Sequence, residues 1–211
     1  MELHAISTGQ QSIDQLVKIA SQIYSWTTAI HIREKKWSDS QVIDAVQQLI
    51  HTGVPPSKIR INSRPQLAVD LNIGGVHLSE YMSYITTDDP LSRWKVGRSV
   101  HSIEQALQAQ DEGVDYLFYG HIYATTSKPD LSPRGLDQLE KLCHAVSIPV
   151  IAIGGIQPEH CQDIHQAGAT GIAVMSGIFE AEHPQHVCRL YNESIQQVTF
   201  TDLQSQSLGK K

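Results

Sequence analysis

The chain has 211 residues, of which 40% are hydrophobic and 18% charged, a composition ordinary for one soluble globular domain. Its formal net charge of −6 gives nucleic acid no general attraction, and no run of lysine or arginine offsets this charge locally. No segment reaches the length of a membrane span, and the first residues, MELHAISTGQ, lack the pattern of a secretory signal, so we expect a cytoplasmic protein without a nucleic-acid or membrane partner.

Short β-rich runs alternate with segments of helical periodicity along the whole sequence. Such repetition predicts parallel βαβ units, and eight of them in this length favour a single (β/α)₈ barrel over an open doubly wound sheet. We assign residues 1–200 to the barrel and expect the polar segment 201–211 to be a flexible tail. The predicted strands are His4–Ser7, Ala29–Arg33, Arg60–Asn62, Gly75–Leu78, Lys95–Ser99, Tyr116–Gly120, Val150–Ile153 and Gly171–Val174.

Several helix ends can be predicted from capping residues. Ser38 or Asp39 precedes the second helical run, and Ser102 has Gln105 three residues later, in the pattern of a capping box. A glycine that can take positive φ follows three helical runs and lets the chain turn back. These glycines are Gly53, Gly113 and Gly168.

The three cysteines, Cys143, Cys161 and Cys188, are odd in number and widely spaced. This pattern indicates reduced thiols better than a disulfide framework or a zinc site. No pair or trio of His, Cys, Asp or Glu has metal-ligand spacing, and the sequence contains no nucleophile elbow or Walker loop. We therefore expect neither a metal nor another cofactor.

The strongest binding signal comes from the glycine-rich ends of the last two predicted strands. In a barrel of this kind the active site lies at the carboxyl ends of the strands. The strings 151–156, IAIGGI, and 171–177, GIAVMSG, would let backbone N–H groups approach an anion, and a helix start at Ser176 would add a hydroxyl and a dipole. This pattern predicts phosphate binding, although Gly154 and Gly155 could also serve only a tight turn.

Other polar side chains follow predicted strands and are weaker candidates. Arg33 and Lys35 point the same way after the second strand and could meet a carboxylate or phosphate, or lie in a solvated loop. Asn62, Ser99 and Lys128 have comparable positions.

His121 follows the sixth predicted strand, where an imidazole could give or take a proton near neutral pH. A structural role is the alternative, because the chain has 11 histidines. The loop 125–129, TTSKP, which begins at Thr125, could cover a polar ligand or be an ordinary surface loop.

Strings along nearly the whole chain resemble the thiamine phosphate synthase-like family. They are IHIREKK at 30–36, INS at 61–63, GGVHL at 74–78, GRSVHS at 97–102, GVDYLFYGHIYATTSKP at 113–129, PRGL at 133–136, IPVIAIGGI at 148–156 and GIAVMSGIF at 171–179. The resemblance implies a barrel. Synthases of this family join a pyrimidine pyrophosphate to a thiazole phosphate, with magnesium held by aspartates after the third and fourth strands.

The chain departs from the synthase pattern at these positions. Ser63 stands where the pattern has Asp, and Leu78-Ser79-Glu80-Tyr81 stands where the pattern ends in an acid, so Glu80 is the only carboxylate nearby. His121 stands where the pattern has proline. The GHI form at 120–122 and the GRSVHS form at 97–102 resemble the TenI-like, thiazole tautomerase branch of the family.

That branch implies an isomerase without a cofactor. It converts the 2-carboxy-4-methylthiazol-5(2H)-ylidene ethyl phosphate tautomer to the aromatic carboxythiazole phosphate used in thiamine biosynthesis, and His121 would move the proton. By the same resemblance Gly154, Gly155, Met175 and Ser176 would hold the phosphate. Arg33, Asn62, Ser99 and Lys128 would line the ring and carboxylate side.

Two alternatives to the tautomerase stay open. One is a thiamine phosphate synthase in which Glu80 and water support magnesium. The other is a non-catalytic, ligand-sensing regulator of extracellular enzyme production, since fold alone does not decide function. The expected partner in each case is a small phosphorylated thiazole, and apolar outer-helix positions leave room for a homodimer.

Overall fold

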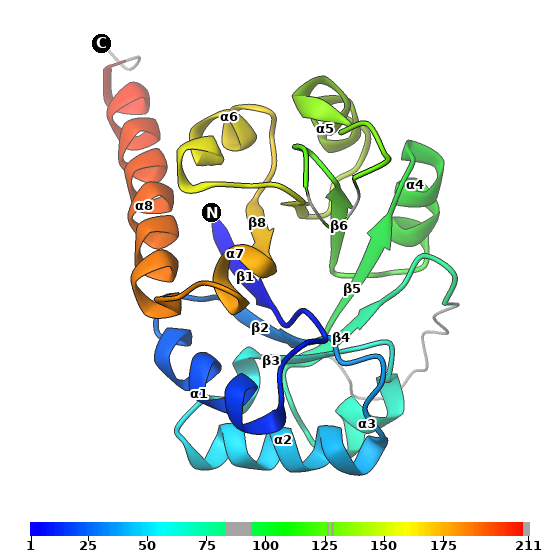
Figure 1. Cartoon of the computed structure of the whole chain (residues 1–211). Helices are drawn as coiled ribbons and strands as arrows, with labels where there is room; N and C mark the ends of the chain where they lie inside the picture. The colour runs from blue at the N-terminus through cyan, green and yellow to red at the C-terminus, as the bar shows by residue number, and fades with distance from the viewer. Residues whose placement is uncertain (83–93, 126, 128, 209–211) are drawn as a thin grey trace.

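Eight parallel strands pair in chain order and close into a barrel in the computed structural model, which describes residues 1–82, 94–125, 127 and 129–208. The barrel closes where β1 (Glu2–Ile6) pairs with β8 (Gly171–Val174), with Glu2 opposite Gly171. Figure 1 shows the strands enclosed by helices. The predicted (β/α)₈ fold is therefore confirmed.

The observed strands differ from the predicted ones by no more than two residues at either end. The agreement follows from β-branched and aromatic residues in short runs, which suit buried parallel strands. Between β1 and β8 lie β2 (Ala29–Ile32), β3 (Ile59–Asn62), β4 (Gly75–Leu78), β5 (Lys95–Val100), β6 (Tyr116–Gly120) and β7 (Val150–Ile153).

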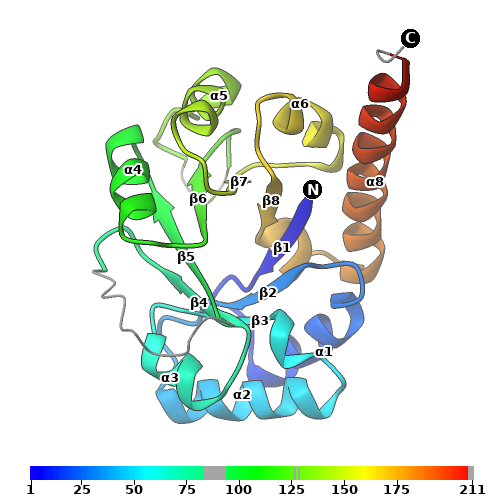
Figure 2. The same cartoon turned by 180° about the vertical axis from the view of Figure 1, so that it is seen from behind.

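The helices lie outside the strands, and α8 packs beside α1 and α6 (Figures 1 and 2). They are α1 (Ile13–Ile23), α2 (Asp39–His51), α3 (Pro65–Asp70), α4 (Ile103–Asp111), α5 (Gly135–Ala145), α6 (Cys161–Gln166), α7 (Ser176–Phe179) and α8 (Pro184–Leu208), with 3₁₀ turns at Pro56–Lys58 and Pro158–His160. Most of the segment 201–211 thus continues α8, and the division at residue 200 stays a prediction. No helix in the described part of the chain is long and apolar enough to cross a membrane.

Capping residues fix several helix starts as the sequence indicated. Ser38 caps α2, and Ser102 caps α4 by accepting a hydrogen bond from the backbone N–H of Gln105. The Gln105 side chain bonds the backbone N–H of His101 instead of Ser102, so the reciprocal half of the predicted capping box is absent at α4. The three glycines predicted to end helices have φ of 94°, 82° and 89° at positions 53, 113 and 168.

The main apolar core lies between the outer face of the barrel and the helices. It contains buried residues of both layers, such as Ile30 and Ile61 on strands and Leu16 and Leu49 on helices. All three cysteines are free thiols, and Cys161 and Cys188 are buried within this layer. Burial raises the pKa of the Cys188 thiol to about 12, so this thiol stays protonated at neutral pH.

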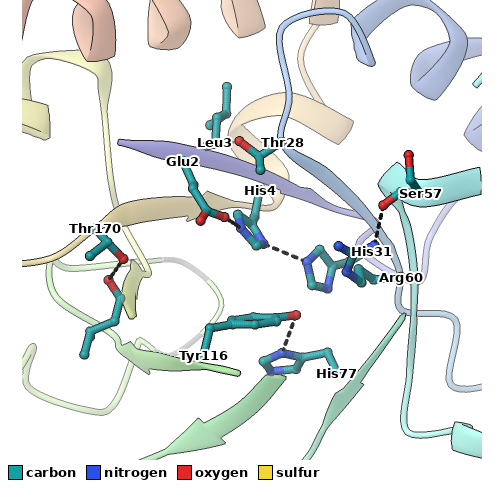
Figure 3. Close-up of polar contacts among 11 residues, drawn as sticks. Glu2, Leu3, His4, Thr28, His31, Ser57, Arg60, His77, Tyr116 and Thr170 are labelled. Atoms are coloured by element: carbon teal, nitrogen blue, oxygen red, sulfur yellow. Dashed lines mark hydrogen bonds and ion pairs between the residues drawn. The ribbon is translucent and has the colours of Figure 1, made fainter. Parts of the chain in front are cut away.

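The inside of the barrel is polar and aromatic at its centre. His4, His31 and His77 are buried there together with Tyr116 and Phe118, and Figure 3 shows the three imidazoles and Tyr116 facing one another. The ring centroids of His77 and Phe118 lie 4.0 Å apart, and those of His4 and His31 lie 5.2 Å apart. Side chains therefore fill the barrel below its mouth.

Gly97 on β5 makes room for this filling. A Cβ atom at this position would lie 2.1 Å from Cζ of Tyr116. The glycine therefore lets the Tyr116 ring lie across the barrel interior.

Candidate active site

A cavity of about 920 Å³ opens at the carboxyl ends of the strands. This volume is within the usual range for small-molecule sites. Its wall combines strand ends β2 to β8 with the loops that follow them. The position is the one at which barrels of this kind carry their active sites.

All the site residues predicted from the sequence that the structure describes line this one cavity. They are Arg33, Lys35, Asn62, Ser99, His121, Thr125, Gly154, Gly155, Met175 and Ser176. Lys128 lies outside the described residues. The structure thus brings the candidates together, while their individual roles stay predictions.

The glycine pair after β7 packs against the segment after β6. Gly154 and Gly155 have φ of 99° and 67°. A Cβ at Gly154 would lie 2.3 Å from Cβ of His121, and one at Gly155 would lie 2.3 Å from the carbonyl oxygen of Ala124. Glycine is required here by both backbone conformation and close approach, so the tight-turn alternative describes part of what this pair does.

The turn after β8 supplies backbone and hydroxyl groups on the same side. Met175 precedes α7, and Ser176 and Gly177 form its first residues. The first N–H groups of a helix have no carbonyl partner within it. Because α7 is a single turn, its dipole is small, and hydrogen-bond donors are the main contribution of this segment.

His121 is buried at the cavity wall with one ring nitrogen engaged. Its Nε2 lies 3.1 Å from the carbonyl oxygen of Leu131, which can only accept a hydrogen bond. Nε2 therefore carries the proton, and in the neutral ring Nδ1 is an acceptor. The backbone N–H of Arg134 donates to the backbone carbonyl of His121 at 2.9 Å, so the backbone of His121 and one nitrogen of its ring are both held.

The opposite wall of the cavity carries charged side chains after β2. Arg33 is half-buried and Lys35 is exposed, and the backbone N–H of Arg33 donates to Oγ of Ser7 at 2.9 Å. Glu34 lies between them with a side chain that is largely buried, and burial raises the pKa of its carboxyl group. This wall can therefore meet an anion with side-chain cations.

Several cavity residues were not selected from the sequence. Arg64 follows β3 and pairs with Asp39 at 3.2 Å, while also donating to the carbonyl of Trp37. Glu80, considered from the sequence only for the synthase alternative, pairs with Nε2 of His101 at 3.0 Å. His77 and Phe118 form the floor. The alternation of His77 with apolar neighbours in GGVHL is a signal that could have placed His77 inside the barrel.

The residues after β3 and β4 do not fit the magnesium site that the family implies. Magnesium prefers carboxylate oxygens, but Ser63 and Tyr81 offer hydroxyl groups and Glu80 is paired with His101. Within the described ranges, no group of three or more His, Cys, Asp or Glu residues could hold a metal ion. We derive no catalytic step through magnesium.

Comparison with known proteins gives consistent matches. The family described as thiamine monophosphate synthase matches residues 3–178. Thiamine-phosphate synthase of Chloroflexus aurantiacus is 37% identical over 170 residues, covering 78% of this chain and 77% of that protein. The synthase of Clostridium acetobutylicum is 34% identical over 172 residues, covering 80% and 82%.

Solved structures agree with the sequence relatives. Thiamine phosphate pyrophosphorylase from Pyrococcus furiosus superposes with a TM-score of 0.73 at 25% identity, covering 93% of this chain and 96% of that one. A 3-hexulose-6-phosphate synthase from Salmonella typhimurium has a TM-score of 0.69 at 13% identity, which shows a shared barrel fold alone.

These relatives contradict two predictions made from the sequence, the thiazole tautomerase function and the isomerase class. The curated relatives are named thiamine-phosphate synthases, which are transferases. The predictions gave a few departures at the strand ends more weight than similarity along the whole barrel. The match over residues 3–178 and the 37% identity show that the chain belongs to the thiamine monophosphate synthase family.

Proposed function

We propose that this chain acts as a thiamine-phosphate synthase and binds a thiazole phosphate at the barrel mouth. The observation that carries the proposal is the single cavity lined by ten of the predicted site residues, in a chain 37% identical to a named synthase. The reaction joins a pyrimidine pyrophosphate to a thiazole phosphate. A bond forms between the thiazole ring nitrogen and the carbon that carries the pyrophosphate, the bond from that carbon to the pyrophosphate oxygen breaks, and pyrophosphate leaves.

The thiazole phosphate would bind at the glycine side of the cavity. Gly154, Gly155, Met175 and Ser176 lie there at the ends of β7 and β8. Backbone N–H groups beside glycines, together with the Ser176 hydroxyl, can hydrogen-bond phosphate oxygens without a cationic side chain.

The pyrophosphate would face the charged side. The half-buried Arg33 and the exposed Lys35 can offset the negative charge that develops on the leaving pyrophosphate, because cations placed beside such charge stabilise it. Ser99 and Thr125 add hydroxyl groups to the cavity wall. This arrangement supports anion binding by side chains at the edge where the family's aspartates are missing.

His121 would contact the ligand through Nδ1, since Nε2 bonds Leu131. His121→Gln is expected to lower kcat/KM by about tenfold, as the loss of one well-placed hydrogen bond does. His144→Gln is the matched control, because His144 lies exposed on α5. An equal loss in both variants would contradict a role for His121 at the site.

Two measurements test the proposal in order. Isothermal titration calorimetry with the thiazole phosphate should show one site, weakened in Ser176→Asp. A coupling assay with pyrimidine pyrophosphate and thiazole phosphate, run with magnesium and with a chelator, should then yield thiamine phosphate. Binding without coupling under either condition would refute the synthase activity and favour the ligand-sensing alternative.

A further inference from the structure

A chain of polar contacts runs inside the barrel from its amino-terminal end to the cavity, and Figure 3 shows its first three members, Glu2, His4 and His31. Oε2 of Glu2 lies 2.8 Å from Nε2 of His4, and Nδ1 of His4 lies 2.9 Å from Nε2 of His31. Nδ1 of His31 then lies 3.4 Å from Oδ1 of Asn62, a residue that lines the cavity. A half-exposed carboxylate is thereby linked to the ligand site.

The carboxylate of Glu2 determines which atom donates and which accepts in each contact of this series, and we call this order the direction of the series. The hydrogen bond from His4 lowers the pKa of Glu2, so Glu2 is ionised at neutral pH and can only accept. Nε2 of His4 must then carry the proton, which leaves Nδ1 as an acceptor in the neutral ring. His31 must donate from Nε2 and keep Nδ1 bare.

Both imidazoles are held neutral by their surroundings. His31 is fully buried, and burial, followed by the neighbouring His4 and His77 and by Arg60, lowers its pKa well below the ordinary value. Burial also lowers the pKa of His4, against the opposing effect of Glu2. A neutral imidazole has one N–H group, so each of the two rings donates from Nε2 and accepts at Nδ1. The contact at Asn62 therefore has the same order as the one at Glu2.

The last bond decides which atom of Asn62 faces the ligand. Oδ1 of Asn62 lies toward Nδ1 of His31, but two acceptors form no hydrogen bond. A half-turn of the amide keeps its shape and brings Nδ2–H to His31. We propose that Glu2, His4 and His31 are positioning residues that fix the amide of Asn62 with its oxygen toward the cavity.

Asn62 would then accept a hydrogen bond from an N–H or O–H group of the substrate and would disfavour a phosphoryl oxygen at the same place. A fitting ligand group is an amine on a heteroaromatic ring, here the pyrimidine, and this identification rests on the proposed function. A phosphoryl oxygen at this place would leave two hydrogen-bond acceptors facing each other, which weakens binding.

A second chain in the barrel has no such direction and provides an internal reference. Nδ1 of His77 lies 3.4 Å from the Tyr116 hydroxyl, and Nε2 lies 2.9 Å from Oγ of Ser99. Both partners are hydroxyls, which donate or accept equally well. The Glu2 carboxylate is the feature that distinguishes the chain leading to Asn62.

Nuclear magnetic resonance of ¹⁵N-labelled histidine rings tests the direction without any ligand or turnover. We expect the protons of His4 and His31 on Nε2 and bare Nδ1 atoms in both rings. A proton on Nδ1 of His31 would overturn the proposal, whether or not the chain proves to be a synthase.

Glu2→Gln tests the origin of the direction, because an amide can donate as well as accept. We expect protonated Nδ1 to appear in His4 and His31 of this variant, with the His77 pattern unchanged. Asp111→Asn is the matched control, since it removes an exposed carboxylate at the end of α4 that lies outside the chain. A wild-type ring pattern in Glu2→Gln would contradict the proposed role of Glu2.

Binding of two probes tests the acceptor at Asn62. We expect an aminopyrimidine to bind the wild-type protein about two- to tenfold more tightly than the matched pyrimidine without the amino group, the usual contribution of one hydrogen bond. The preference should shrink in Glu2→Gln and persist in Asp111→Asn. An equal preference for the aminopyrimidine in wild type and Glu2→Gln would refute the acceptor role. This comparison needs no turnover, so it can be made even if the coupling assay fails.

Discussion

The two sides of the barrel mouth are built from different kinds of groups. The side formed by β6 to β8 depends on close contacts, in which Gly154 packs against His121 and Gly155 against the backbone of Tyr123 and Ala124. The side formed by β2 to β4 depends on side chains, with Arg33 and Lys35 above buried imidazoles. We therefore expect substitutions that change side-chain volume to have the largest effects on the first side. On the second side we expect effects from changes in charge, salt concentration and pH.

The largest expected effect comes from breaking the backbone packing with Gly155→Ala. Its Cβ would lie 2.3 Å from the Ala124 carbonyl oxygen at a φ of 67°, so we expect a loss of about 3 kcal/mol or more in the free energy of unfolding, with loss of thiazole phosphate binding. Gly135→Ala is the matched control: its φ is 75° but nothing lies within 4 Å, and about 1 to 2 kcal/mol is expected. Chemical denaturation that gave equal losses would show that the contact is unimportant.

Acid should next weaken the charged side through the buried histidines. Burial lowers the pKa of His77 to about 3 and also lowers those of His4 and His31, whereas unfolded histidines titrate near 6.5. Below pH 6.5 the unfolded state therefore binds more protons than the folded state. The free energy of unfolding keeps its full value, as far as these histidines are concerned, above pH 6.5 and falls as the pH decreases toward 3.

The expected slope is up to about 1.4 kcal/mol per pH unit for each of these histidines. Denaturation curves between pH 5.5 and 6.5 measure it above the range of ordinary carboxyl groups. His77→Asn should reduce the slope, and the exposed control His144→Gln should not. A slope in His77→Asn as steep as that of the wild type would exclude His77 as a cause.

A negative charge on the backbone side should weaken phosphate binding. Ser176→Asp places a carboxylate at the start of α7, and like-charge repulsion is expected to raise the Kd for thiazole phosphate by about tenfold. Ser21→Asp on α1 is the control for added charge away from the cavity. Calorimetry that found equal Kd values in the two variants would refute phosphate binding at Ser176.

Removing a cation from the opposite side should have the smallest effect. Lys35 is exposed, so Lys35→Met is expected to weaken pyrophosphate binding by only about threefold, and added salt should abolish the difference. Arg33→Met should cost more, because Arg33 is half-buried. If added salt left the affinity differences of Lys35→Met and Arg33→Met from the wild type unchanged, these residues would act through packing rather than through charge.

The sequence predicted the barrel and its mouth because both depend on local patterns. Short β-rich runs and helix-ending glycines such as Gly53 can be recognised one element at a time. The candidates from Arg33 to Ser176 were found because each lies at the end of a predicted strand or in the segment that follows it. The sequence did not predict the functional class correctly, because the departures at Ser63 and His121 describe single positions rather than the relationship of the whole chain.

The sequence by itself determined the order of elements, the end of the barrel that carries the site, and the glycines that shape one side of it. Only the tertiary structure decided which side chains meet across the barrel. Glu2, His4, His31 and Asn62 come from three different strands, and no local pattern records that their polar atoms align. Closure of the barrel brings these strands into register, so the direction of the hydrogen bonds beneath the site is a property of the folded chain.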